Sequence, residues 1–384
     1  MVRKFELTRR AFLEFTLAVP VWLALPSGLV CAATLRVTGQ RHWSAPDHTR
    51  LVFELDAPAQ FATRAYSDPD RVVLEIHNAQ HRDGDLEIVV DDGLIKRISF
   101  KNLPDSLLVR VELVRAADFS AFPLAPNAGG ERHRIVLDVR KRLTAAEQAA
   151  QDRDTESVRK SGDVVVAVDA GHGGNDPGCS GHRVVEKDVA LAVAHLTAAA
   201  ITRKPRLRAV LTRDRDYFIP LGRRPEIARR FDAGAFVSIH LNSAASPEAS
   251  GSEVFFLSMK GAADKAAREL IDRENAADLV GGVPPGEAAT PVLNILMNMK
   301  QNQALRESER LGEIVLDKLA TLPSNDSRGL KQGPLAVLKS ITCPSVLVEL
   351  GFVTNKRDAR RMLDPDGQRR YAALIADGVA EFLE

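Results

Sequence analysis

The chain has 384 residues, enough for two ordinary domains, and 45% of them are hydrophobic while 27% are charged. This balance excludes a largely disordered chain. Lysine and arginine number 52 and aspartate and glutamate 51, so a net charge of +1 argues against a protein that grips nucleic acid through bulk positive charge. Three cysteines exclude a disulfide scaffold, whereas nine histidines leave a metal site of histidines and carboxylates open.

Residues 1–33 have the composition of an export signal. Arg9 and Arg10 precede a moderately apolar run, residues 15–30, which is followed by small residues. A charged start, an apolar middle and a small-residue exit are typical of a signal peptide, and paired arginines indicate the twin-arginine type. A membrane anchor is the alternative, but two prolines interrupt the run. We therefore predict a periplasmic protein with no membrane span after processing.

Residues 34–141 read as short strands separated by turns that contain aspartate, glycine or proline. Such spacing predicts a small all-β sandwich. The predicted strands cover residues 51–55, 71–76, 86–90, 107–113 and 134–139. Residues 142–162 are polar and lack strong apolar periodicity, which indicates a linker, in part helical.

Residues 163–384 alternate buried strands with helices, so we predict an α/β domain with a mixed sheet layered by helices. Apolar runs predict strands at 164–168, 209–212, 235–239 and 346–348. Helical spacing predicts helices at 184–201, 221–231 and 371–383.

Three side chains that can bind metal lie at the ends of these elements. His172 stands in a glycine-rich loop after the first strand, Glu186 at the start of a helix, and His240 at the end of a further buried strand. Taken singly, the glycine-rich loop could bind phosphate, Glu186 could be a first-turn residue that the helix dipole stabilises, and His240 could belong to the core. Together they form a His₂Glu set, which holds catalytic zinc and leaves one position for water.

Glu349 ends another buried strand, where a carboxylate is costly unless it has a partner or a task. Zinc hydrolysis needs a carboxylate that takes a proton from water and passes it to the leaving amine, so Glu349 is the predicted general base. Cys179 and Cys343 lie near these loops in the sequence, and a thiol ligand or a disulfide between them stays open.

At this point the resemblance to a known family is specific. Residues 163–384 resemble the zinc-dependent N-acetylmuramoyl-L-alanine amidases of the Amidase_3 family that separate daughter cells, the AmiA, AmiB and AmiC type. The matching segments are VDAGHGGNDPG, VVEKDVAL, TRD, LGRRPEIA, FVSIHLNS and VLVELGFVTN. The resemblance implies hydrolysis of the amide between the lactyl group of N-acetylmuramic acid and L-alanine. It also implies that His172, Glu186 and His240 are metal ligands and Glu349 the catalytic glutamate.

The segment between His240 and Glu349 is longer than a simple crossover needs. We predict a strand at 253–257, one long helix at 260–280, and a further helix at 294–319. The insert at about 260–300 could merely cap the sheet. The resemblance implies instead a regulatory insert that blocks the cleft until a protein activator of the division machinery binds, with Glu274 filling the open zinc position.

The β domain at 34–141 resembles the AMIN module that precedes such amidases, which implies wall targeting. Its acidic and basic residues nearly balance, so binding of peptidoglycan must depend on shape and hydrogen bonds; a spacer or protein-docking role is the alternative. Two rival functions remain for the whole chain. One is a zinc peptidase that cuts within the stem peptide, and the other is a non-catalytic wall-binding protein on an amidase fold.

Overall fold

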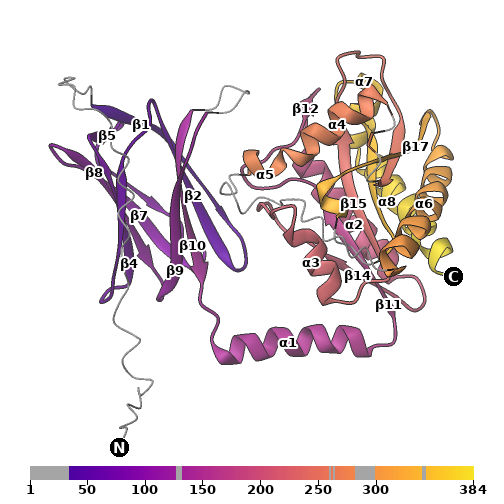
Figure 1. The fold of residues 1–384 in the computed structure, drawn as a ribbon, viewed down its shortest axis with the longest axis horizontal. Helices are drawn as coiled ribbons and strands as arrows, with labels where there is room; N and C mark the ends of the chain where they lie inside the picture. The colour runs from indigo at the N-terminus through magenta and orange to yellow at the C-terminus, as the bar shows by residue number, and fades with distance from the viewer. Residues whose placement is uncertain (1–33, 127–131, 259–260, 263, 282–298, 340–342) are drawn as a thin grey trace, which may run out of the picture. The chain divides into compact units, whose positions relative to one another are not determined.

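The computed structural model describes residues 34–126, 132–258, 261–262, 264–281, 299–339 and 343–384. The predicted signal at 1–33 lies outside these ranges. The described chain contains a β-rich domain and an α/β domain, each with its own hydrophobic core (Figure 1). In the described ranges, no helix combines the length and the apolar composition that a membrane crossing requires.

The β domain is a sandwich of two five-stranded sheets. One sheet has the order β5-β1-β2-β10-β9, and the other β3-β4-β8-β7-β6. Phe53 of one sheet meets Phe100 of the other edge to face, with ring centroids 6.0 Å apart. The strands are β1 (Leu35–Ser44), β2 (His48–Leu55), β3 (Phe61–Tyr66), β4 (Arg71–His77), β5 (Ala79–His81), β6 (Leu86–Val89), β7 (Ile95–Asn102), β8 (Ser106–Leu113), β9 (Ala117–Leu124) and β10 (His133–Lys141).

The five predicted strands of this domain correspond to β2, β4, β6, β8 and β10. Strands such as β3 and β9 carry few fully buried residues, so their apolar alternation in the sequence is weak. The predicted linker contains a 16-residue helix, α1 (Ala145–Lys160). Thr144 and Glu147 form a capping box at its start, which satisfies backbone N–H groups that the helix cannot pair itself.

The α/β domain is built on a six-stranded mixed sheet with the order β14-β11-β15-β18-β16-β17. Its first four strands run parallel, and β16 runs antiparallel to β18. The central strands are buried on both faces, which explains their continuous apolar runs. The strands are β11 (Val164–Ala170), β14 (Leu207–Leu211), β15 (Ala235–Asn242), β16 (Ser252–Leu257), β17 (Ser327–Gly333) and β18 (Ser345–Phe352); β12 (Ser180–Gly181) and β13 (Val184–Val185) form a separate pair.

Helices cover both faces of this sheet, as predicted. One face packs against α2 (Glu186–Thr202), α6 (Met299–Ala320) and α8 (Pro365–Leu383), and α7 (Lys356–Leu363) packs on α8. The other face packs against α3 (Arg223–Arg230), α4 (Lys265–Asn275), α5 (Ala277–Val280) and the short 3₁₀ helix η1 (Ala336–Leu338). The predicted fold class is therefore confirmed for both domains.

The prediction of one long helix over 260–280 is wrong. The chain forms α4 and α5, which are separated at Ala276. Asp264 caps the start of α4 by accepting a hydrogen bond from the Ala267 N–H. At the other end, the Asn275 side chain donates to the Pro334 carbonyl and accepts from the Ala336 N–H, which fixes the end of α4 against the η1 loop. The front of the predicted 294–319 helix lies outside the described residues, and the rest is α6.

Candidate metal centre

His172 lies in the loop that follows β11, where the chain must turn sharply. Its backbone has φ 57°, a left-handed value that is rare for histidine, and Gly173 follows with φ 123°. A Cβ atom at Gly171 would stand 2.5 Å from the His240 ring, so only glycine lets the loop approach β15 this closely. The side chain of His172 is buried, and its Nδ1 contacts Asp176 Oδ2 at 2.8 Å.

Glu186 is the first residue of α2 and is fully buried. Its Oε2 accepts a hydrogen bond from the Cys179 N–H at 2.8 Å, and its Oε1 accepts one from the Leu241 N–H at 2.9 Å. These two bonds hold the carboxylate in one orientation. A glutamate whose only role was its favourable interaction with the helix dipole would face solvent at the first turn. The dipole alone therefore does not account for the buried Glu186.

His240 and Glu349 lie side by side on neighbouring parallel strands. They are direct register partners between β15 and β18. The prediction that each residue ends its strand is wrong, because β15 continues to Asn242 and β18 to Phe352. Glu349 is fully buried, and within the described residues neither of its carboxylate oxygens has a hydrogen-bond partner. An unpaired buried carboxylate is costly, and its retention here indicates a task in the site.

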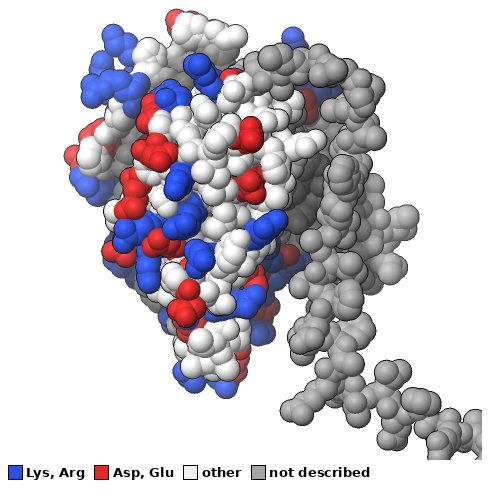
Figure 2. Space-filling view, turned by 90° about the vertical axis from the view of Figure 1, so that its left-hand side faces the viewer, with Lys and Arg blue, Asp and Glu red and all other residues white. Residues whose placement is uncertain are grey.

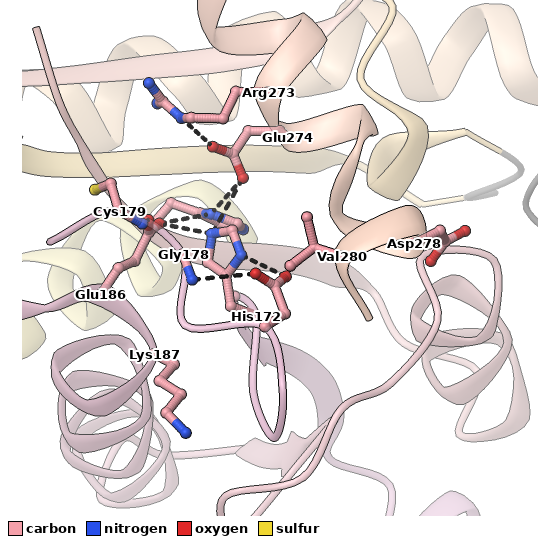
Figure 3. Close-up of polar contacts among 12 residues, drawn as sticks. His172, Gly178, Cys179, Glu186, Lys187, Arg273, Glu274, Asp278 and Val280 are labelled. Carbon is pink, nitrogen blue, oxygen red and sulfur yellow. Dashed lines mark hydrogen bonds and ion pairs between the residues drawn. The ribbon is translucent and has the colours of Figure 1, made fainter. Parts of the chain in front are cut away.

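The structure brings all three predicted ligands together with Glu274, which comes from the last turn of α4 (Figure 3). One donor atom from each of the four side chains lies within 4.8 Å of the other three. His172 Nε2 is 3.0 Å from Glu186 Oε1 and 3.2 Å from Glu274 Oε2. His240 Nδ1 is 3.0 and 3.1 Å from the same two oxygens.

This donor set fits a zinc ion. Two imidazole nitrogens and two carboxylate oxygens around one point match the ligand types and the four-coordinate geometry that zinc prefers. The buried His172 Nε2 and Glu274 Oε2 atoms have no properly oriented hydrogen-bond partner in the described chain, as expected for atoms that bind a metal. The Asp176 contact to the other ring nitrogen of His172 is the kind of second contact that orients a metal-bound histidine.

The electrostatics of the site are those of carboxylates crowded around two imidazoles. Burial lowers the pKa of His172, but the Glu186, Asp176 and Glu274 carboxylates outweigh burial and raise that pKa well above its usual value. The pKa of His240 rises to about 9, because Glu274 and Glu186 outweigh its burial. Burial raises the pKa of Glu349 well above its usual value, and the nearby Glu274 and Glu186 carboxylates add to the effect.

Neither cysteine thiol belongs to the cluster of His172, Glu186, His240 and Glu274. Cys179 and Cys343 are both free thiols. Cys179 donates a hydrogen bond to the Leu241 carbonyl at 3.0 Å, and burial raises its pKa, so the reactive thiolate is disfavoured. Sequence reasoning missed Asp176, whose signal is its place four residues after His172 in the same glycine-rich loop.

Together, the fold and the site define a class of α/β proteins with a candidate metal centre where the strands of a mixed sheet meet the loops that follow them. The β-sandwich and this domain each correspond to a known family. Residues 166–381 match Amidase_3, N-acetylmuramoyl-L-alanine amidase, and residues 40–139 match the AMIN domain. Because the first match covers more than half of the chain, the protein belongs to the Amidase_3 family of N-acetylmuramoyl-L-alanine amidases.

Two AmiC relatives align along nearly the whole chain, and an AmiA relative aligns along part of it. The N-acetylmuramoyl-L-alanine amidase AmiC of Escherichia coli O6:H1 is 30% identical over 98% of this chain and 96% of that protein. AmiC of Neisseria meningitidis serogroup B is 31% identical over 98% of each. AmiA of Escherichia coli K12 is 37% identical over 58% of this chain and 78% of its own length. The chain is thus an amidase of peptidoglycan, which confirms the predicted activity and substrate.

Proposed function

We propose that zinc is the metal of this amidase and that His172, Glu186 and His240 hold it. The observation that carries this proposal is the convergence of their donor atoms, together with Glu274, within 4.8 Å. Zinc bound there would lower the pKa of a bound water and polarise the lactyl carbonyl of N-acetylmuramic acid. His172 and Glu186 are held by side-chain and backbone contacts outside the four-residue cluster.

Glu349 is the proposed general base. Its carboxylate lies beside His240 across the β15–β18 ladder and has no hydrogen-bond partner in the described chain, so it is free to accept a proton from the attacking water. The same carboxyl group then protonates the nitrogen of L-alanine as the amide bond breaks. A buried site in low dielectric strengthens each of these interactions.

Glu274 is the proposed inhibitory ligand of the resting enzyme. Its carboxylate lies within 3.2 Å of both histidines, where it would serve as a fourth ligand of a bound metal. Arg273 holds this end of α4 by donating to Asn242 Oδ1 and Ser243 Oγ, each at 3.1 Å. Figure 3 shows its contact with the Glu274 carboxylate. The space left beside the histidines and Glu274 is about 10 Å³, room for one water and far too little for a muramyl peptide.

A closed site of this kind requires a conformational change before the substrate can enter. We propose that a protein activator of the division machinery binds the insert and draws α4 away, so that wall cleavage is confined to the separation of daughter cells. The AmiC and AmiA names of the relatives support a division role for this chain. The contacts of Arg273 and Glu274 are what such an activator must break.

The β domain, residues 34–141, is proposed to target the enzyme to the wall. The outer face of the sheet β3-β4-β8-β7-β6 carries a groove of about 690 Å³. Arg64, Lys101 and Arg110 line it, and among the described residues they have no ion-pair partner, so they are available to carboxylates of the stem peptides. Figure 2 faces the side on which β4, β7 and β8 lie in Figure 1, and shows basic and acidic side chains interleaved there.

The test of the amidase site uses purified sacculi. The mature chain with zinc should release stem peptides with a free L-alanine amino terminus, which mass spectrometry identifies; fragments cut inside the stem peptide would support a peptidase instead. The His172→Ala and His240→Ala variants should each lose most of their zinc by elemental analysis. Full zinc in both variants would overturn the ligand assignment.

The test of the groove uses binding to sacculi in the presence of a chelator, so that cleavage is silent. Arg64→Gln combined with Arg110→Gln should weaken cosedimentation with sacculi. The matched control, Arg36→Gln combined with Arg140→Gln, removes the same charge from exposed positions on the other sheet. Equal loss in both pairs would show a general charge effect, and no loss in the first pair would remove the groove from the proposal.

The AMIN domain and the AmiC relatives imply an exported, periplasmic protein. We propose that the route is the twin-arginine pathway, on the evidence of Arg9 and Arg10 in the sequence. That pathway carries folded proteins, which suits a chain whose metal ligands come from three separate segments of one fold.

A further inference from the structure

Two arginines lie fully buried beneath the metal-binding loop, and the proposed chemistry uses neither. Arg213 and Arg224 are each 1% exposed, which is rare for arginine. They belong to the TRD and LGRRPEIA segments of the sequence. Burial, with the nearby Arg224 charge, lowers the pKa of Arg213 to about 10, so the Arg213 side chain stays charged at neutral pH.

Arg224 binds the loop that carries His172. Its guanidinium donates to the His172 carbonyl at 2.9 Å and to the Ala170 carbonyl at 2.7 Å. It also donates to the Asp169 carboxylate at 3.0 Å. Because His172 has a left-handed backbone, the loop needs such external hydrogen bonds to hold this conformation.

Arg213 connects the same loop to the helix that carries Glu186. One of its nitrogens donates to both the Gly171 and the Lys187 carbonyls at 2.8 Å, and its Nε donates to the Ala170 carbonyl at 3.0 Å. Lys187 directly follows Glu186 at the start of α2. Arg213 therefore sets the distance between the segments of two predicted ligands.

Asp169 extends these contacts to the third ligand. Its carboxylate accepts hydrogen bonds from the Thr212 hydroxyl at 2.6 Å and the Ser238 hydroxyl at 2.5 Å, in addition to Arg224. Ser238 lies on β15 two residues before His240, so both side chains point from the same face of the strand. The segments of all three ligands thus meet in one buried polar network.

We propose that Arg213, Arg224 and Asp169 are positioning residues that hold the three ligand segments in the geometry the metal requires. The inference rests on the proposed metal site and assigns to these residues a role in metal affinity rather than in proton transfer. A guanidinium suits the role because its planar fork donates to several carbonyls at once, whereas a lysine ammonium is a single point of charge. Arg224→Lys therefore keeps the charge beside Asp169 and loses the fork.

The experiment compares zinc affinity in the full mature chain by competition with a chromogenic chelator, and records the visible spectrum of the cobalt-substituted protein as a report of coordination geometry. Arg224→Lys should weaken zinc binding about 10- to 100-fold and alter the cobalt spectrum. The control is Arg361→Lys on α7, because Arg361 also donates to a carboxamide and to backbone carbonyls, those of Pro323 and Ser324, away from the centre. This control should retain wild-type affinity.

The outcomes separate the two proposals. Wild-type protein that binds no zinc removes the proposed metal site itself. Zinc-binding wild type with unchanged affinity in Arg224→Lys, or equal weakening in Arg361→Lys, overturns the positioning role. If Arg224→Lys does not fold, Thr212→Val removes one hydroxyl donor to Asp169 with little change of shape. It should weaken zinc binding several-fold, and unchanged affinity in that folded variant overturns the role equally.

Discussion

Among single residues, Glu349 stands out, because an acidic side chain lies in the middle of a fully buried strand. Its neighbours across the sheet are His240 on β15 and Glu253 on β16. Glu253 is paired with Lys331 at 2.8 Å, whereas Glu349 has no hydrogen-bond partner among the described residues. Two adjacent buried glutamates thus have different surroundings: Glu253 is in an ion pair, and Glu349, the proposed general base, has no hydrogen-bond partner among the described residues.

Glu349→Gln keeps the size and removes the base. We expect zinc content to equal that of the wild type and sacculus hydrolysis to fall about 10²- to 10⁴-fold, since general base catalysis contributes about that much. Elemental analysis and a peptide-release assay on the same sample measure the two quantities. Near-normal turnover would move the proton-transfer role to another group.

Asp169 makes a pH-dependent contribution to stability. Burial raises its pKa, but Arg224 and the Ser238 and Thr212 hydroxyls outweigh burial and lower the pKa below its usual value. A lowered folded-state pKa stabilises the fold above the unfolded-state pKa of about 4, and the stabilisation is lost as the pH falls through the folded-state value. Asp169→Asn should therefore destabilise the domain by about 3 kcal/mol at pH 7, because it leaves Arg224 without its buried partner.

Below pH 4 the difference in the free energy of unfolding between Asp169→Asn and the wild type should shrink, because the wild-type carboxyl becomes neutral as well. Thermal unfolding followed by circular dichroism from pH 7 downward measures it. Asp366→Asn is the control, since that carboxylate is 70% exposed and should give no comparable change. A difference that stays constant with pH would contradict the assignment.

At the scale of elements, α4 serves two purposes. Its apolar face, Ala267, Leu270 and Ile271, belongs to the core beneath the sheet. Its last turn carries Arg273 and Glu274 into the metal centre. An element with one face in the core and one end in the site can close the site, but its removal costs core packing as well as the blocking contact.

Glu274→Ala should raise basal hydrolysis of sacculi without an activator. If the open state, with α4 drawn away, is about 1% populated, an activator that binds it more tightly by roughly 2.7 kcal/mol raises its population to half. One or two docked apolar side chains supply that much. Removing the carboxylate contact to both histidines acts in the same direction. Glu269→Ala, on the exposed side of α4 with a side chain 68% exposed, is the control and should not change the rate.

A second variant separates blocking by the helix from blocking by the carboxylate. Deletion of residues 260–280 with a short glycine-rich bridge removes α4 and α5 together. If the deletion variant hydrolyses sacculi faster than the wild type, while a folded and zinc-loaded Glu274→Ala variant keeps the wild-type rate, the helix blocks the site sterically. If neither is faster, the insert is structural and regulation lies elsewhere.

At the scale of the whole molecule, two domains with separate cores divide the work. The β-sandwich has no part in the four-residue cluster, whose members all come from the α/β domain. The groove that we propose binds wall peptides lies on the outer face of one of its sheets. A chain of this kind must reach the periplasm with both domains intact.

The export route is tested on the precursor. Arg9→Lys combined with Arg10→Lys should leave the precursor in the cytoplasm, because the twin-arginine pathway reads that pair. Cell fractionation and immunoblotting measure the distribution, with a protein of the general secretory route as control. Normal periplasmic yield in a strain that lacks the twin-arginine pathway would establish the general route instead.

The sequence alone determined both fold classes and the family, and it singled out His172, Glu186, His240 and Glu349 as candidate site residues. These features depend on local patterns, because apolar runs mark buried strands and polar residues directly after such runs collect at one edge of the sheet. The strands β3 and β9 escaped prediction because few of their side chains are fully buried.

Only the tertiary structure decided how distant segments meet. It divided the predicted helix at Ala276, because Asn275 is bound to the η1 loop some 60 residues further along the chain. It placed Glu274 against both histidines and buried Arg213 and Arg224 beneath the loop. No periodicity encodes such contacts, because each depends on the packing of elements far apart in the chain, and this packing sets the geometry of the metal centre.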